Sequence, residues 1–333
     1  MGARSATMMA AIALASVAGG ARAEITELAV AQQYGISYLP LMVMEEQKLI
    51  EKHAKDAGLD VKVTWAKFAG GNVMNDALLS GSLHVASGGV GPLLTLWSRT
   101  RGNLDVHGIS AINSMPLHLI SRNPAVKTIR DFTDKDRIGL PAVKVSIQAV
   151  ILQMAAEQAF GAGQQNRLDA FTVSLSHPDA MQALMAGQSE VNAHFGSPPF
   201  QYQELAKPEN HVVLNSYDVL GGPATFNLVW TTAKFRNENP KLYEAFTKAL
   251  DDAIAQINRD KRAAAQAYLR VSKGKDSVEN IEKMLNDPAI VYTTTPQNVQ
   301  KFAEFMAKVG AIKVKPESWK DLFFPNAHAL AGS

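Results

Sequence analysis

The 333 residues of this chain include no cysteine. Disulfide bonds, thiolate metal sites, cysteine nucleophiles and iron–sulfur clusters are therefore excluded together, and so is a lipid anchor on an N-terminal cysteine. Neither sign of charge is in large excess, because the chain has 33 Lys and Arg against 31 Asp and Glu. No Lys/Arg cluster occurs, which argues against a nucleic-acid partner. Hydrophobic residues make up 47% of the chain, as is typical of a folded globular protein.

Catalytic and metal-binding motifs are absent as well. The sequence has no G-x-S-x-G, H-E-x-x-H or P-loop motif and no complete G-x-G-x-x-G. None of the eight histidines is three or four residues from another, so no local metal motif exists, although a site assembled across the fold stays open. We therefore predict a protein that is not an enzyme, without catalytic residues, a metal or a cofactor.

The N-terminal segment has the pattern of a secretory signal peptide. Arg4 precedes an apolar stretch over residues 8–17, and Ala21-Arg22-Ala23 forms a small-x-small cleavage site before Glu24. Arg4 and Arg22 account for the formal charge of +2, so the mature chain is balanced. No later stretch reaches the roughly 18 apolar residues of a membrane span. We expect residues 1–23 to be cleaved and the mature protein to be periplasmic, soluble and not a lipoprotein.

The remainder alternates predicted strands with predicted helices, which indicates an α/β fold with a parallel sheet covered by helices. Alternating or buried apolar runs predict strands over residues 25–31, 61–65, 83–87, 118–121, 137–140 and 226–230. Helical periodicity, with Ser, Asn or Pro at the start and Gly at the end, predicts helices over residues 40–53, 72–80, 92–97, 147–160, 240–257, 261–271 and 296–309.

Part of the chain repeats. Residues 76–92 and 182–198 match at a constant offset of 106, with a shared helix end, glycine, short strand and proline. The repeat indicates two doubly wound lobes built on similar βαβ units, each offering loops to a shared cleft. We expect residues 24–116 and 226–333 to form one lobe and residues 117–225 the other. The two crossings, near residues 113–117 and 224–228, would form a two-strand hinge.

Several loops follow predicted strands and converge in a doubly wound sheet. Glycines there let backbone N–H groups approach a ligand, Ser146 at a helix start turns a positive helix end toward an anion, and Lys144 offers a full charge. Each feature also has a purely structural alternative. For the glycines it is turn geometry, for Ser146 an ordinary N-cap, for Lys144 a solvated side chain, and for His194 a hydrogen-bonded, partly buried histidine. The candidate ligand-binding residues are Gln32, Tyr34, Gly70, Gly71, Ser87, Gly88, Gly89, Ser114, Lys144, Ser146, His194 and Phe195.

Residues 68–92 (FAGGNVMNDALLSGSLHVASGGVGP) resemble the signature of periplasmic solute-binding proteins of the nitrate/sulfonate/taurine importer family. That family also includes thiamine-pyrimidine-precursor binders and related pyrimidine synthases. Residues 136–146 (DRIGLPAVKVS) and 177–195 (HPDAMQALMAGQSEVNAHF) follow in the family's order. The resemblance implies a type II periplasmic-binding-protein fold that delivers a small molecule to a membrane permease and its ATPase.

Departures from the family pattern bear on the ligand. The loop before Ser146 has Lys144 where sulfonate binders are usually rich in Gly and Ser. Val90 replaces a frequent Asp, so no carboxylate is offered there to an amine, and His194-Phe195 replaces a Trp-containing segment. The synthases' Cys-rich motif is missing, since the chain has no cysteine.

These features favour a monomeric binding protein of an ATP-driven (ABC) importer that captures a small organic anion such as a sulfonate. Tyr34 and Phe195 would cover the ligand's apolar part. One alternative is a neutral heterocycle, such as a thiamine pyrimidine precursor, stacked on Tyr34 or Phe195. Others are a pyrimidine-synthase-like enzyme with His194 as base or metal ligand, and a ligand-sensing partner of a membrane receptor.

Overall fold

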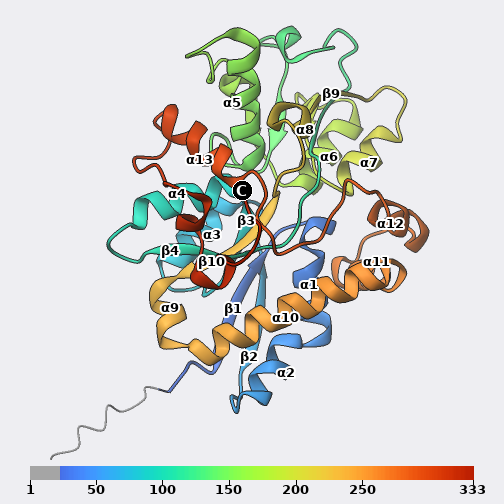
Figure 1. Ribbon diagram of the computed structural model, residues 1–333. Coiled ribbons are helices and arrows are strands. Elements are labelled where there is room, and N and C mark those ends of the chain that lie inside the picture. The colour runs from blue at the N-terminus through green and yellow to red at the C-terminus, as the bar shows by residue number, and fades with distance from the viewer. Residues whose placement is uncertain (1–22) are drawn as a thin grey trace, which may run out of the picture.

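The computed structural model describes residues 23–333, and residues 1–22 of the predicted signal peptide lie outside the described residues. Its strands form two separate groups, each with helices around it (Figure 1). We call the part built around strands β1 to β4 and β10 the first lobe. The part built around strands β5 to β9 is the second lobe, drawn in green and yellow in the upper half of Figure 1.

The first lobe contains β1 (Glu27–Gln32) and β2 (Lys62–Lys67) as a parallel pair. A second group places β10 (Asn227–Thr232) between β3 (Ala86–Gly89) and β4 (Val106–Ala111), antiparallel to both. A parallel bridge between Val30 and Val85 joins the two groups, with the amide of Ala31 donating to the carbonyl of Val85 at 2.9 Å. The strand order across the lobe is therefore β2-β1-β3-β10-β4.

The second lobe has a five-stranded sheet in the order β7-β6-β8-β5-β9. Strand β6 is parallel to β7 and β8, whereas β5 is antiparallel to β8 and β9. Its strands are β5 (His118–Ser121), β6 (Ile138–Leu140), β7 (Thr172–Ser174), β8 (Ala193–Phe195) and β9 (His211–Asn215). Both sheets are mixed, so antiparallel strands accompany the parallel ones that the alternation of strands and helices predicts. The antiparallel strands β5 and β10 directly follow the segments that cross between the lobes.

Helices cover both sheets. Among the helices that begin just after a strand are α3 (Gly71–Leu79) after β2, α4 (Val90–Thr100) after β3, α5 (Ile147–Phe160) after β6 and α6 (His177–Ala186) after β7. The long helix α10 packs along α1 and α2 at the bottom of Figure 1. The remaining helices are α1 (Leu39–Gln47), α2 (Leu49–Asp56), α7 (Phe200–Leu205), α8 (Ser216–Leu220), α9 (Ala233–Glu238), α10 (Pro240–Arg259), α11 (Lys261–Ser272), α12 (Val278–Leu285) and α13 (Val299–Lys308).

The chain crosses between the lobes at two segments that lie side by side. The amide of Phe226 donates to the carbonyl of Asn113 at 3.2 Å, and the hydroxyl of Ser114 donates to the carbonyl of Ala224 at 2.8 Å. The C-terminal region joins them, because the amide of Ser114 donates to the carbonyl of Val291 at 2.8 Å. Three stretches remote in sequence are thus hydrogen-bonded where a hinge between the lobes would lie.

Most of the predicted helices and strands are present in the structure, with shifted ends. Helix α5 has the predicted bounds, Ile147–Phe160, because Ser146 caps its start and Gly161 follows its end. The single helix predicted over residues 40–53 is instead two, α1 and α2, since Lys48 between them takes a left-handed φ of 52°. The sequence repeat corresponds to equivalent structure: Gly81 and Gly187, with φ of 77° and 75°, follow α3 and α6, and strands β3 and β8 come next.

The core of each lobe is apolar. The two largest fully buried side chains, Trp97 and Trp230, both belong to the first lobe, and the indole of Trp230 donates to the Oδ1 atom of Asn75 at 3.1 Å. In the second lobe, Phe195 and much of α5 are buried. Among residues 23–333, none of the helices combines the length and the apolar character that a membrane crossing needs.

Candidate functional site

Four helix N-termini meet at the boundary between the lobes. Helices α3 and α4 approach it from the first lobe and α5 and α6 from the second. Their starts contribute Gly71, Gly89, Ser146 and His177 to the wall of one small cavity. The placement follows from the fold, since each helix starts where a strand of its lobe ends. Unpaired N–H groups give a helix N-terminus partial positive charge, so the four together make a site suited to an anion.

The two lobes are closed on each other here, and glycines permit it. A Cβ atom on Gly89 would lie 2.6 Å from the Cβ of Ile147 in the opposite lobe. One on Gly91 would lie 2.5 Å from the carbonyl oxygen of Val145, and one on Gly70 would lie 2.8 Å from that of Pro141. Real Cβ atoms do not approach so closely. The glycines of the first lobe therefore let its backbone reach the loops of the second.

The closed cavity is small and carries no formally charged side chain. About 10 Å³ is open to the centre of a water molecule, roughly the space for one water. A larger ligand must therefore displace side chains of this wall. The wall combines polar groups with proline and aromatic surfaces. It consists of Gln33, Tyr38, Gly71, Gly89, Pro92, Pro141, Ser146, Ile147, Gln148, His177 and Phe226.

Tyr38 and Ser146 are the hydroxyl groups of this wall. The Tyr38 hydroxyl accepts a hydrogen bond from the Asn227 amide at 2.8 Å, which leaves its own proton for a ligand. Burial raises the pKa of Tyr38 far above its usual value of 10, so the hydroxyl keeps this proton at physiological pH. Ser146 Oγ accepts from the amide of Ala149 at 3.2 Å, so Ser146 is an N-cap whose hydroxyl proton is free to turn toward a ligand.

Behind His177 lies a buried line of polar side chains. The Nε2 atom of His177 is 3.2 Å from the amide nitrogen of Gln148, and its Nδ1 atom is 2.9 Å from Nε2 of His194. The Nδ1 atom of His194 is 2.5 Å from Oε1 of Glu204. All four side chains are at most 4% exposed. Burial, and to a lesser extent the neighbouring His194, lower the pKa of His177 well below its usual value, so its ring is neutral at pH 7.

Three of the twelve residues predicted from the sequence line the cavity, namely Gly71, Gly89 and Ser146. Gly70 is the N-cap of α3 and faces Pro141. Gly88, with φ of 159°, lies in β3 against Gln33 and Trp230. These two glycines therefore shape the wall from behind.

The other predicted residues lie elsewhere in this closed form. Ser114 joins the two crossings, and His194 is one layer behind His177. Gln32 donates to Glu45 within the first lobe. Ser87 donates to the carbonyl of Ala31, and Tyr34 is half-buried. Phe195 is fully buried in β8, and Lys144 is exposed with a left-handed φ of 66°.

Sequence reasoning missed several lining residues. Gln33 directly follows β1, next to the predicted Gln32, and Gln148 is two residues after Ser146. His177 had a usable local signal, because Ser176 caps α6 and so marks its start as another helix N-terminus; its Oγ accepts from the amide of Asp179 at 3.3 Å. Tyr38 and Phe226 reach the cavity from segments that tertiary packing alone brings together.

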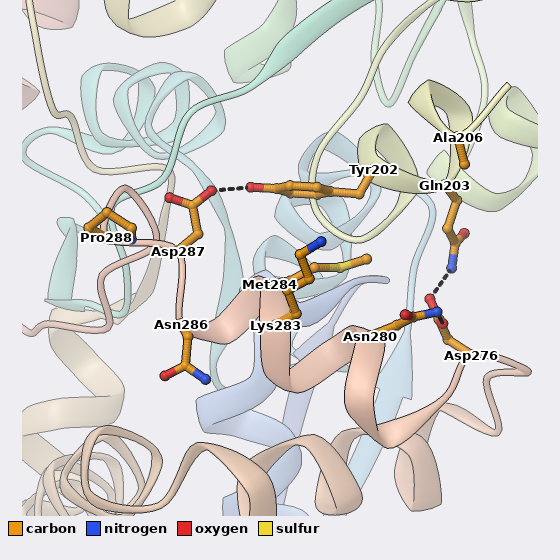
Figure 2. A pocket seen from close by; sticks show the side chains of 10 residues that line it. All are labelled: Tyr202, Gln203, Ala206, Asp276, Asn280, Lys283, Met284, Asn286, Asp287 and Pro288. Carbon is orange, nitrogen blue, oxygen red and sulfur yellow. Dashed lines mark hydrogen bonds between the residues drawn. The ribbon is translucent and has the colours of Figure 1, made fainter. Parts of the chain in front are cut away.

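A much larger cavity, about 810 Å³, lies between α7 of the second lobe and the region of α12 (Figure 2). Two hydrogen bonds span it: the Tyr202 hydroxyl donates to Asp287 at 2.6 Å, and the Gln203 amide donates to Asp276 at 3.0 Å. Burial raises the pKa of Tyr202, and the bond to Asp287 raises it further, which keeps the hydroxyl a donor. This cavity shares no lining residue with the one at the helix N-termini. Its side chains connect the two lobes.

A metal site formed by three or more His, Asp or Glu side chains is not found within residues 23–333. Although His177, His194 and Glu204 are consecutive partners, they form a line and do not surround a common point. Their arrangement suits the transfer or storage of a proton.

A family model described as the NMT1-like family matches residues 21–271 of the chain. Comparison with curated protein sequences gives no significant match. Among solved structures, the alkanesulfonate-binding protein SsuA from Xanthomonas axonopodis pv. citri, bound to MOPS, superposes with a TM-score of 0.69 at 18% identity. That alignment covers 92% of this chain and 98% of the other.

Two further structures give similar values. The periplasmic nitrate-binding protein NrtA from Synechocystis PCC 6803 has a TM-score of 0.68 at 15% identity, over 90% of this chain and 84% of that one. The ligand-binding component of an ABC-type import system from Staphylococcus aureus, with zinc bound, has a TM-score of 0.68 at 14% identity. It aligns over 93% of this chain and 100% of its own. The type II periplasmic-binding-protein fold with two lobes, predicted from the sequence, is thereby confirmed.

Proposed function

The chain belongs to the NMT1-like family, and from that premise we propose that it is the substrate-binding component of an ATP-driven (ABC) importer. In this proposal it captures a small anion, such as a sulfonate, between its lobes and delivers it to a membrane permease and its ATPase. Residues 24–116 with 226–333 and residues 117–225 are the two lobes, and the crossings at Asn113–Ser114 and Ala224–Phe226 are the hinge. The protein acts as a periplasmic monomer after cleavage of residues 1–23, and it binds without catalysing a reaction.

The observation that carries the proposal is the convergence of four helix N-termini on one buried cavity between the lobes. Each terminus favours an anion by about 0.3–1 kcal/mol when exposed and by up to about 2 kcal/mol when partly buried. The hydroxyls of Tyr38 and Ser146 and the amides of Gln33 and Gln148 add neutral donors, and hydrogen bonds to a charged group contribute about 1.5–3 kcal/mol each. Lys144 is not needed as a counter-charge, because these dipoles face the cavity directly.

A neutral heterocycle is the second candidate. The cavity wall has no formally charged side chain, and Tyr38, Phe226, Pro92 and Pro141 offer flat or apolar surfaces to a ring. A pyrimidine precursor with both donors and acceptors would fit the amides of Gln33 and Gln148. This alternative differs from the first in the charge of the ligand and not in the location of the site.

A thermal-shift panel of nitrate, alkanesulfonates, small carboxylates and pyrimidines tests the proposal. A ligand present at one hundred times its Kd stabilises the folded protein by about 2.7 kcal/mol, which gives a measurable rise in Tm. We expect the anions to raise Tm and the pyrimidines to leave it unchanged. A pyrimidine response alone would favour the second candidate, and no response from properly folded protein would refute both.

The variant Ser146→Ala locates the ligand, and Lys144→Ala is its matched control on the same loop. We expect Ser146→Ala to weaken anion binding, because it removes a donor from the cavity wall. Lys144→Ala should bind as the wild type does, since Lys144 is exposed and does not line the cavity. The reverse result would place the anion on the outer side of this loop.

A further inference from the structure

The line of side chains behind His177 connects the cavity to the interior of the second lobe. It runs from Gln148 at the cavity wall through His177 and His194 to Glu204 on α7, with successive distances of 3.2, 2.9 and 2.5 Å. Its three links join elements that are separate in sequence, namely α5, α6, β8 and α7. We refer to Glu204, His194 and His177 as the relay.

Every hydrogen bond along the relay is donated in the same direction, from Gln148 toward Glu204. The amide nitrogen of Gln148 donates to Nε2 of His177, so this ring atom holds a lone pair and the proton of His177 is on Nδ1. Nδ1–H of His177 then donates to Nε2 of His194, and Nδ1–H of His194 donates to Oε1 of Glu204. In this state both rings are neutral, and the lone pair on Nε2 of His177 is taken up by the Gln148 amide at the cavity wall.

The negative charge of the Glu204 carboxylate, at the inner end of the relay, is poorly compensated. Glu204 is fully buried, and its second carboxylate oxygen has no hydrogen-bond partner among the described residues. No Lys or Arg within residues 23–333 forms an ion pair with Glu204, whose only ion-pair partner there is His194. A buried carboxylate with one neutral donor is unfavourable, and a cation beside it relieves the cost.

One additional proton converts the relay into a neutral unit. The proton adds to Nε2 of His177 while the Gln148 amide turns, so that its carbonyl oxygen accepts from the new N–H in place of the bond its nitrogen had donated. His177 passes its Nδ1 proton to Nε2 of His194. His194 becomes an imidazolium ion beside the Glu204 carboxylate, while His177 stays neutral and now carries its proton on Nε2. The turned Gln148 amide then presents its N–H groups to the cavity, and the negative charge of Glu204 is compensated.

Resting on the function proposed above, we propose that binding of an anion in the cavity is coupled to uptake of one proton by the relay. Both consequences of the added proton favour an anion: the N–H group that Gln148 had donated to His177 becomes available to the ligand, and a net negative charge in the same lobe disappears. Gln148 is the ligand-contacting residue of this mechanism, and His177 sets which group Gln148 turns to the cavity. His194 and Glu204 are positioning residues, because they act through His177.

The surroundings are consistent with this location of the charge. Burial, and secondarily His194, lower the pKa of His177 well below its usual range. His194 is the ring in direct contact with the Glu204 carboxylate, so the geometry places the cation on His194. The nearby titratable groups have partners or environments of their own. Those on the packed elements and across the cavity are Asp179 on α6, Asp136 before β6, His118 on β5, Tyr202 on α7, Glu157 on α5 and Tyr38 of the first lobe.

These groups do not supply the missing counter-charge. Asp179 accepts from the Ser176 hydroxyl and Asp136 from amide and hydroxyl donors. Glu157 pairs with Lys308 at 2.7 Å. Burial lowers the pKa of His118, and it raises the pKa values of Tyr38 and Tyr202, so all three are neutral at pH 7.

The first test is nitrogen NMR of the mature protein labelled with ¹⁵N-histidine, since ring-nitrogen shifts distinguish a protonated atom from a lone pair. His177→Asn and His194→Asn variants assign the signals. Between pH 9 and pH 5 we expect Nε2 of His177 to gain a proton while His194 becomes cationic at the same midpoint. Unchanged tautomers over this range, or a cation on His177, would overturn the proposal without reference to any ligand.

The second test is calorimetry with nitrate and methanesulfonate in two cationic buffers, imidazole and Tris, because anionic buffers compete for the site. Above the midpoint we expect one proton taken up per anion and a loss of affinity of about tenfold per pH unit. Glu204→Gln should abolish the uptake and flatten the pH profile. Glu190→Gln, a matched change on an exposed glutamate of the same lobe, should leave both intact.

The outcomes separate the two proposals. If the anions bind without proton uptake, the coupling is wrong and the proposed function stands. If neither anion binds, the proposed anion ligand is wrong and the coupling falls with it. If Glu204→Gln fails to fold, as its melting curve would show, the labelled wild-type protein still decides on the relay.

Discussion

Replacing Gly89 with alanine tests whether the ligand is bound in the closed form. The backbone of Gly89, with φ of −73° and ψ of 168°, is one that alanine adopts without strain. The added Cβ would lie 2.6 Å from the Cβ and Cγ2 atoms of Ile147, which belongs to the opposite lobe. The methyl group is therefore tolerated within the first lobe, and its clash exists only when the lobes close.

The expected size of the effect follows from the cost of overpacking, about 1–3 kcal/mol. When this cost falls on the binding-competent state alone, the apparent Kd rises in proportion to the loss of that state. At 1.4 kcal/mol per factor of ten, the variant should bind about 5- to 150-fold more weakly. The free energy of unfolding of the ligand-free protein should change little, because the open form relieves the contact.

Isothermal titration with the best anion of the thermal-shift panel measures the affinity, and small-angle scattering measures the compaction on ligand addition. Gly274→Ala is the matched control, because Gly274 lies outside the cleft and has no left-handed φ. Wild-type affinity and wild-type compaction in Gly89→Ala would refute the reasoning. That result would mean that the bound state never brings Gly89 to Ile147.

Three further predictions address the cap, the link between the lobes and the acid limit of stability. Ser146→Ala should lower the free energy of unfolding in urea by about 1 kcal/mol through loss of the α5 cap, whereas Ser146→Thr should retain most of it; equal losses would contradict the cap. Tyr202→Phe removes the 2.6 Å hydrogen bond to Asp287 between the lobes, and a net worth of about 0.5–1.5 kcal/mol predicts roughly 2- to 12-fold weaker binding in titration; unchanged affinity would mean that the bond persists in the open form. Burial raises the pKa of Asp136, but hydrogen bonds from neighbouring amides and hydroxyls outweigh it and leave the pKa below its usual 3.8. Its contribution is thus present at neutral pH and lost as the pH falls below about 4, so Asp136→Asn should flatten the fall of Tm between pH 5 and pH 2, and an unaltered curve would be evidence against this role.

Local chemistry explains where sequence reasoning succeeded. Helix α5 was predicted with both ends, because its capping Ser146 and its terminal Gly161 act on neighbouring backbone groups. The same reasoning found Gly71 and Gly89, since the loop between a strand and the next helix needs small residues wherever another backbone approaches. The repeat predicted two equivalent units, and the strands β3 and β8 occupy corresponding positions in them.

Elements that depend on remote partners were missed. Strand β4 exists because β10, more than a hundred residues later, pairs with it, and β9 exists because β5 does. The left-handed φ of Lys48 divides a helix that periodicity predicts as continuous. Strands β4 and β9 lack a strong alternating pattern, so the sequence near them carries little information about their structure.

The candidate site shows the same division between local and tertiary information. The sequence determined the class of fold, the family resemblance and the helix starts from which Ser146 and two glycines face the cavity, because these depend on patterns within a few residues. Only the tertiary structure decided that Lys144 turns outward, that His177 reaches the cavity and that Glu204 ends the line behind it. The physical reason is that an interlobe site is assembled from segments whose spacing in the chain contains no record of their distance in space.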